Sequence, residues 1–342
     1  MNRESFRRHY EAIRTRTERR LKKVAPGAAS PRLREACRYA LQGGGKRVRP
    51  ALLVLSCEAV GGGVAEALDA AAAIEIMHNF TLVHDDIMDN ADARRGRPSV
   101  HRAWSVNDAL LVGDVLVGAS FDALLRTRGN ARGALAGILT RGLLDVCEGQ
   151  ALDLEFETRT DVTVREYFRM IGKKTGALLA AAAELGGTLG GGSRPRVAAL
   201  RRFGLHLGTA FQVQDDLLDV VGDPAGFGKT IGGDILEGKR TYLLLTAAAR
   251  ASGGDRALIA RVMAHDGAPG SWRTAGGTVT PGGRALVEEV RGAYERCGAI
   301  DEAREVVRRT TRRALRELDR LPRNPARAML GWLADELVHR AT

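Results

Sequence analysis

Two clusters of aspartates repeat one spacing and are the side chains best suited to chemistry. They are Asp85, Asp86 and Asp89 in the first half of the chain, and Asp215, Asp216 and Asp219 in the second. On a helix, positions i, i+1 and i+4 fall within about 100° of one face, so the three carboxylates repel one another. A hard cation such as Mg²⁺, which takes carboxylate, water and phosphate oxygens, would relieve that repulsion. A solvated acidic patch would also explain one cluster, but the repeat favours metal sites.

Basic residues follow each cluster within a few turns. Arg94 and Arg95 lie in a Gly/Pro-punctuated loop after the first cluster, and Lys229 and Lys239 follow the second. Guanidinium and ammonium groups donate charged hydrogen bonds to phosphate oxygens. Metal-binding carboxylates with trailing cations indicate a site for a polyphosphate held from two sides.

A third feature is the triple glycine at 43–45, which precedes Lys46 and Arg49. Glycine lets the backbone approach an anion closely, and the basic side chains supply charge and directed donors. Alone this segment is a weak phosphate signal, because many Gly-Lys-Arg turns look similar.

Long helices have to position these residues. Aromatic residues make up only 5% of the chain, and alternating β-branched runs are scarce, so the pattern favours helices over a sheet. The sequence predicts an all-α fold, a single large helical bundle forming one domain over residues 1–342. We expect helices at 6–24, 31–41, 65–89, 104–125, 131–156, 167–185 and 196–221, an exposed loop at 267–283, and two or three closing helices that break at Pro322 and Pro325.

One predicted helix contains a weak point. Lys174, Thr175 and Gly176 lie in the middle of the 167–185 segment, and Thr and Gly are poorer helix formers than Ala. We expect a local break there, where backbone carbonyls and a hydroxyl could face a cation.

The charge of the chain indicates anionic partners. The formal net charge is +11, which fits either diphosphates or nucleic acid. Basic residues alternate with acidic ones along the helices, and no zinc-finger or aromatic RNA-binding signature is present, so we expect no nucleic acid.

The sequence also bears on the compartment. We expect a soluble cytoplasmic protein, because no apolar signal core and no membrane-spanning run is visible. Four scattered cysteines without metal-binding spacing should be reduced and mostly buried: Cys37, Cys57, Cys147 and Cys297.

Taken together, these motifs resemble those of the trans-isoprenyl diphosphate synthases, the head-to-tail polyprenyl synthetase family. The resemblance rests on the first aspartate cluster with Arg94-Arg95-Gly96, the second with Gly222-Asp223, and the segment from Gly44 to Pro50. The motifs occur in the order of the family and span residues 43–241. The combination is specific, whereas each motif alone is not.

The resemblance implies a reaction: head-to-tail condensation of isopentenyl diphosphate with an allylic diphosphate, with release of diphosphate. It implies about three Mg²⁺ ions held by Asp85, Asp89 and Asp215, while Asp86, Asp216 and Asp219 orient waters and neighbouring groups. The isopentenyl diphosphate would be bound by Lys46, Arg49, His78 and Arg95. The allylic diphosphate would be bound by Arg94, Lys174, Gln212, Lys229 and Lys239, with Thr175 near the developing carbocation.

Product length and assembly also follow from the resemblance. Phe80 and the small Thr81, five and four residues before the first aspartate, would form the floor of the elongation cavity. A large ring there implies geranylgeranyl diphosphate, with farnesyl or longer products as alternatives. His84 is expected to pack or to support its neighbours, and the 104–125 and 131–156 helices to form the bundle wall and the interface of a homodimer.

Three other readings remain open from the residues. A terpene cyclase shares the first motif, but it would carry an Asn-Asp-x-x-Ser-x-x-x-Glu second motif. A non-catalytic partner subunit would lack some of the aspartates or cations. A phosphohydrolase built on His84 and Asp85 would need further metal-binding histidines.

Overall fold

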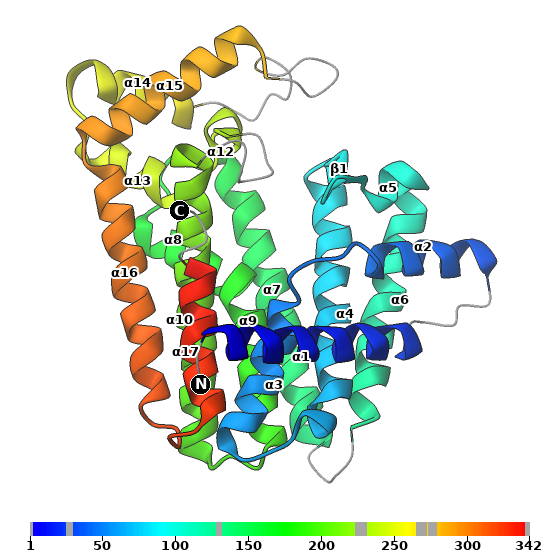
Figure 1. Cartoon of the computed structure of the whole chain (residues 1–342). Helices are drawn as coiled ribbons and strands as arrows, with labels where there is room; N and C mark the ends of the chain where they lie inside the picture. Colours follow the sequence, from blue (N-terminus) through cyan, green and yellow to red (C-terminus); the bar gives the residue numbers. More distant parts are fainter. Residues whose placement is uncertain are drawn as a thin grey trace. The chain divides into compact units, whose positions relative to one another are not determined.

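The chain folds into helices that follow one another through most of its length (Figure 1). The computed structural model describes residues 3–24, 30–127, 132–222, 231–264, 272 and 279–338. The only strands within these ranges are β1 (Ala93–Arg94) and β2 (Arg97–Pro98), which form a short antiparallel hairpin. The predicted all-α class is confirmed.

Two compact units divide the chain. The first comprises Met1–Val146, Leu178–Gly204 and Arg316–Leu333, and the second comprises Cys147–Ala177, Leu205–Leu315 and Ala334–Thr342. The single-domain organisation stays a prediction.

The first unit is built around α4 (Val64–Met88), which packs against its neighbours through small residues. Ala70 to Ala73 are fully buried, and the Ser120 hydroxyl of α6 donates to the carbonyl of Ala73 at 2.8 Å. Such a bond requires the two helices to approach closely. The other helices within this unit are α1 (Arg3–Val24), α2 (Pro31–Leu41), α3 (Val48–Val60), α5 (Val100–Ala103) and α6 (Val106–Leu125).

The second unit holds α8 (Val164–Ile171), a π-helix η1 (Gly172–Gly176), α12 (Gly233–Leu236), α13 (Tyr242–Arg250), α14 (Gly253–Met263) and α15 (Pro281–Arg296). Five further helices each contain a point at which the chain crosses from one unit to the other. They are α7 (Arg132–Thr158), α9 (Ala177–Leu189), α10 (Arg194–Val221), α16 (Ala299–Leu318) and α17 (Pro325–Val338).

Among the expected boundaries that differ from the structure, two have a visible cause. The helix expected at 104–125 begins at Val106, because the Ser105 hydroxyl accepts from the Asp108 amide at 3.1 Å and caps the new helix. The loop expected to end at 283 ends earlier, because Thr280 caps α15 and Pro281 opens it. Most of that loop lies outside the described residues.

All four cysteines are free thiols. Cys37 and Cys57 are buried, but Cys147 is exposed and Cys297 is half-buried, so the expectation that most are buried is wrong. Among the helices described here, none is both long and apolar enough to cross a membrane.

Candidate active site

The first aspartate cluster lies at the C-terminal end of α4, and its members differ in burial. Asp85 is half-buried and Asp89 is exposed, whereas Asp86 is only 3% exposed. Burial raises the pKa of Asp86, while the Arg94 guanidinium, whose Nε donates to Asp86 at 2.6 Å, opposes the rise. Asp86 is thus committed to a protein partner, and Asp85 and Asp89 are the members that solvent reaches.

A strained hairpin presents the two arginines. Arg95 and Gly96 form the turn between β1 and β2, and both have positive φ values, 54° and 74°. Two positive φ values match the twist of a two-residue hairpin, but they strain a residue other than Gly or Asn. The Arg95 guanidinium donates to the carbonyl of Gly44, so the hairpin is tied to the glycine run.

The glycine run has a backbone that other residues would not adopt without strain. Gly44 and Gly45 have φ values of 69° and 120°. A Cβ on Gly45 would lie 2.8 Å from the Arg95 guanidinium, which rests directly on the backbone. Lys46 follows with an exposed side chain, and its carbonyl accepts from the Tyr10 hydroxyl.

Positive charge gathers behind this loop. Arg47 is buried and paired with buried Glu75 at 2.6 Å, while Nε of Arg49 is buried without a hydrogen-bond partner among the described residues. Burial lowers the pKa of Arg49 to about 10; Glu75 opposes the drop and Arg95 adds to it. Buried cationic donors that lack a full set of acceptors fit an anionic ligand.

His78 lies within the same charge cluster. Burial lowers its pKa well below the ordinary value, and the arginines Arg49 and Arg95 lower it further. The imidazole is therefore neutral, and it can donate a hydrogen bond without adding another charge. A small cavity of about 50 Å³ lies nearby, with Asp86, Arg94 and Arg95 in its wall.

The second aspartate cluster, on α10, repeats the division found in the first. Asp215 is half-buried, whereas Asp216 and Asp219 are 5% and 7% exposed. Asp219 accepts from the backbone amide of Asp234 at 3.0 Å. Burial, and then the Asp234 carboxylate, raise the pKa of both buried aspartates.

A chain of hydrogen bonds runs from Asp216 to Thr175. The Tyr167 hydroxyl donates to Asp216 at 2.6 Å, and Nε2 of Gln212 donates to its other oxygen at 3.0 Å. A carboxylate only accepts, so Oε1 of Gln212 must point the other way, where it accepts from the Thr175 hydroxyl at 2.8 Å. Because its proton is used in this way, the Thr175 oxygen could act toward a ligand only as an acceptor.

The predicted weak helix is a π-helix, η1, between α8 and α9. Such bulges are frequent at functional sites. A Cβ on Gly149 of α7 would lie 2.2 Å from the Lys174 amide nitrogen, so Gly149 permits the widened turn to approach. The expected local break at Lys174 and Thr175 is confirmed.

Lys174 and Lys239 each have an acidic partner. Nζ of Lys174 lies 2.5 Å from Asp153, and Nζ of Lys239 lies 3.1 Å from Glu237 and 3.7 Å from Asp234. Lys229 was also predicted, but it lies outside the described residues.

Several residues that complete these arrangements escaped the sequence reasoning: Tyr167, Asp234, Asp153 and Glu75. Asp153 lies four residues after Gly149 on α7, and Asp234 follows a glycine pair five residues before Lys239. These spacings are detectable in the sequence, whereas no local pattern distinguishes Tyr167 or Glu75 from core residues.

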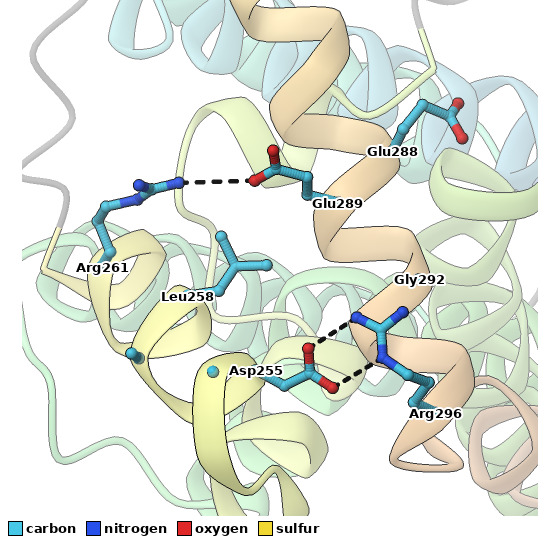
Figure 2. A pocket seen from close by; sticks show the side chains of 9 residues that line it. Asp255, Leu258, Arg261, Glu288, Glu289, Gly292 and Arg296 are labelled. Carbon is cyan, nitrogen blue, oxygen red and sulfur yellow. Dashed lines mark hydrogen bonds and ion pairs between the residues drawn. The ribbon is translucent and has the colours of Figure 1, made fainter.

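A larger cavity lies elsewhere in the second unit. Its volume is about 610 Å³, and Figure 2 shows its charged walls on α14 and α15. Arg296 holds Asp255 through two bonds of 2.7 and 2.9 Å, and Arg261 lies 3.9 Å from Glu289. Of the predicted site residues that the structure describes, none lines this cavity.

The proposed metal ligands fit a hard cation by their chemistry. Asp85, Asp89 and Asp215 offer oxygen donors that are partly or wholly exposed. Mg²⁺ is usually held by one or two carboxylates together with water and substrate phosphates. Within the described ranges, no three His, Cys, Asp or Glu side chains come close enough to hold a metal by themselves.

The described fold is helical, and each aspartate motif has a basic side chain close to it. Residues 30–271 match the polyprenyl synthetase family model. A short chain isoprenyl diphosphate synthase of Methanothermobacter thermautotrophicus is 42% identical over 310 residues, with 90% of each chain covered. A geranylfarnesyl diphosphate synthase of Natronomonas pharaonis is 38% identical, with 91% of this chain and 90% of that one covered. The chain therefore belongs to the polyprenyl synthetase family, and it is a prenyltransferase.

Solved structures of polyprenyl and geranylgeranyl synthases have the same fold as this chain. The geranylgeranyl pyrophosphate synthetase of Pyrococcus horikoshii Ot3 superposes with a TM-score of 0.89 at 35% identity, covering 98% of both chains. A polyprenyl synthase of Caulobacter crescentus CB15, solved with calcium and isoprenyl diphosphate, superposes with a TM-score of 0.86 at 29% identity, covering 98% of this chain and 97% of that one.

The bond between Tyr167 and Asp216 can be tested directly. Tyr167→Phe should lower the free energy of unfolding by about 1–3 kcal/mol, because a buried carboxylate loses a donor. Urea unfolding monitored by circular dichroism measures this change. Tyr39→Phe is the matched control, since its hydroxyl donates to the carbonyl of Pro98 at an exposed position. Equal losses in the two variants would contradict the role of Tyr167.

Proposed function

We propose that this chain condenses isopentenyl diphosphate with an allylic diphosphate to make a short-chain all-trans prenyl diphosphate. The observation that carries the proposal is the repeated division of the aspartates, with accessible Asp85 and Asp215 beside buried Asp86 and Asp216. Membership of the polyprenyl synthetase family and the named relatives support it.

Isopentenyl diphosphate is assigned to the positive cluster of the first unit. Lys46 offers an exposed ammonium group, and Arg95 a guanidinium held over the glycine run. Arg49 offers a buried Nε that has no hydrogen-bond partner in the described part of the chain. A neutral His78 donates to the diphosphate without repelling the arginines. These groups orient the homoallylic double bond for attack.

The allylic diphosphate is assigned to both aspartate motifs and to the cations Arg94, Lys174 and Lys239, with Lys229 and Gln212 as further ligands from the sequence prediction. Mg²⁺ bound by Asp85, Asp89 and Asp215 would neutralise the leaving diphosphate. The buried members Asp86, Asp216 and Asp219 do not bind the metal in this scheme. Their hydrogen bonds to protein donors would help to orient the neighbouring metal-binding aspartates. A count of about three ions remains part of the proposal.

The Thr175 oxygen has a role in the same scheme. Its proton is donated to Gln212, so its lone pairs are available to an electron-poor carbon. An allylic cation formed near η1 would be stabilised by such preorganised dipoles, as are other charged transition states. Proton loss from the condensed cation to the departing diphosphate would complete the cycle.

We assign the control of product length to two residues of α4, Phe80 and Thr81. Phe80 is 9% exposed, and the adjacent Thr81 donates its hydroxyl to the carbonyl of His78 at 2.8 Å. A bulky ring at this position would limit the elongation cavity, so we favour geranylgeranyl diphosphate as the product. The relatives include a geranylfarnesyl synthase, so a longer product is the alternative.

A homodimer through α6 completes the proposal. Val106, Leu110, Leu111 and Leu125 of α6 are 43–53% exposed. On an ideal helix they fall within about 140° of one another, which makes an apolar face suited to a second copy of this chain. Cytoplasmic localisation belongs to the same proposal.

Asparagine at either accessible aspartate should disable catalysis. Asp85→Asn or Asp215→Asn should lower kcat at least about 100-fold, because stabilisation of the leaving group weakens. The Mg²⁺ concentration for half-maximal rate should also rise. Asp122→Asn, at an exposed ion pair on α6, is the control. Near-parental turnover in a folded Asp85→Asn protein would refute the metal assignment.

The two diphosphate sites should be separable by mutation. Lys46→Ala and Arg49→Ala should raise KM for isopentenyl diphosphate about 10- to 100-fold, as expected for a lost charged hydrogen bond. Lys174→Ala should act mainly on the allylic substrate. Lys173→Ala, which removes the pair with Glu148, serves as the control. Equal effects on both substrates would argue against the assignment.

The proposed dimer face can be disrupted at Leu111. Leu111→Glu should convert the protein to a monomer at micromolar concentration, because a charge replaces apolar area in the interface. Light scattering after size-exclusion chromatography measures the mass. Thr15→Glu on the exposed side of α1 should leave the dimer intact. A monomeric parental protein would contradict the proposal.

A further inference from the structure

The contact between α4 and α6 holds an imidazole that the proposed mechanism does not use. His84 follows Phe80 by one turn on α4, and its ring lies edge-on to the Phe80 ring with centroids 4.9 Å apart and planes at 67°. This is the edge-to-face arrangement that aromatic rings favour. The two helices run side by side in the first unit (Figure 1).

Opposite His84, α6 has a gap where a side chain would be. A Cβ on Gly113 would lie 1.9 Å from Nε2 of His84 and 2.4 Å from Cδ2. No side chain can be added at Gly113 unless the ring moves. The imidazole therefore fills a notch that only glycine leaves open.

A hydrogen bond fixes the ring within this notch. Nε2 of His84 lies 3.3 Å from the carbonyl oxygen of Leu110, one turn before Gly113. Because a carbonyl only accepts, Nε2 carries the proton and donates. The ring is thus held on one side by α6 and presents its other side to Phe80.

We propose that His84, seated in the Gly113 notch, is a positioning residue that holds the Phe80 ring in place and thereby sets product length. This inference rests on the proposed role of Phe80 as the floor of the elongation cavity. The imidazole lies against the Phe80 ring, one turn along α4, and so blocks one direction in which that ring could turn away from the growing chain. Product length then depends on two side chains. One is the residue at position 80, through its size, and the other is the His84 imidazole, the brace that holds the ring of that residue in place.

The test compares product distributions at equal turnover, with isopentenyl diphosphate and farnesyl diphosphate as substrates. His84→Ala should raise the fraction of products longer than geranylgeranyl diphosphate about 2- to 12-fold, the ratio that corresponds to loss of one edge-to-face contact. His84→Asn keeps a donor for Leu110 but lacks the ring, and should give the same shift. Thermal melting monitors folding of each variant.

A double-mutant cycle isolates the notch. Gly113→Ala should change the product distribution in the parental chain, because its methyl group displaces the imidazole, but not in the His84→Ala background. Gly254→Ala on α14 is the control, since it lies away from the proposed dimer face and no described atom lies within 4 Å of its added Cβ. Additive effects of Gly113→Ala and His84→Ala would overturn the brace.

Phe80→Ala separates this inference from the proposal on which it rests. Longer products from Phe80→Ala but an unchanged distribution from both His84 variants would overturn the brace and leave the floor intact. An unchanged distribution from Phe80→Ala would remove the floor and, with it, the brace. Longer products from Phe80→Ala, His84→Ala and His84→Asn would support both.

Discussion

Glycines at helix contacts are the constraint on which the candidate site depends. An added Cβ on Gly186 would lie 2.0 Å from the carbonyl of Leu53, and one on Gly149 would lie 2.2 Å from the amide of Lys174. The atoms that an added Cβ would strike belong to the backbone, so no side chain could rotate to make room for it. The helices can therefore pack this closely only with glycine at these positions. The π-helix of η1 can widen toward α7 only because Gly149 is there. Placement of the chemical groups on η1 is thus a consequence of backbone packing.

Burial sorts the aspartates into two roles that their spacing alone does not reveal. Asp86 and Asp216 are removed from water, and each accepts hydrogen bonds from protein donors. A buried carboxylate without donors would cost several kcal/mol, so Arg94 and Tyr167 are required wherever these aspartates are buried. The accessible members, Asp85 among them, lie next to these hydrogen-bonded aspartates on the same helices. Rigid placement of ligands is what catalysis by charge stabilisation needs.

The sequence predicted more of the fold than of the surroundings of the site. Helix periodicity located α2 and α10 closely, and a run of weak helix formers located η1, because both signals are local. The start of α6 was placed two residues early, at Trp104, because the Ser105 cap decides the boundary. Glu75 and Tyr167 were missed for a different reason. Their partners, Arg47 and Asp216, are 28 and 49 residues away, and only the folded chain brings them together.

In the first unit, one buried cationic group lacks a hydrogen-bond acceptor among the described residues, and an anion could supply it. Glu75 neutralises Arg47 deep in the cluster, but Nε of Arg49 is buried without an acceptor among the residues described. Burial of this cation costs solvation, as its lowered pKa indicates. A diphosphate would supply both acceptors and negative charge at a position where water is already excluded. The solvation cost of burying Arg49 therefore arises on folding, before any ligand binds. A diphosphate would then bind more tightly, because it does not have to desolvate this cation. The strained turn at Arg95 fits the same pattern, because its backbone conformation is held by the fold whether or not an anion is present.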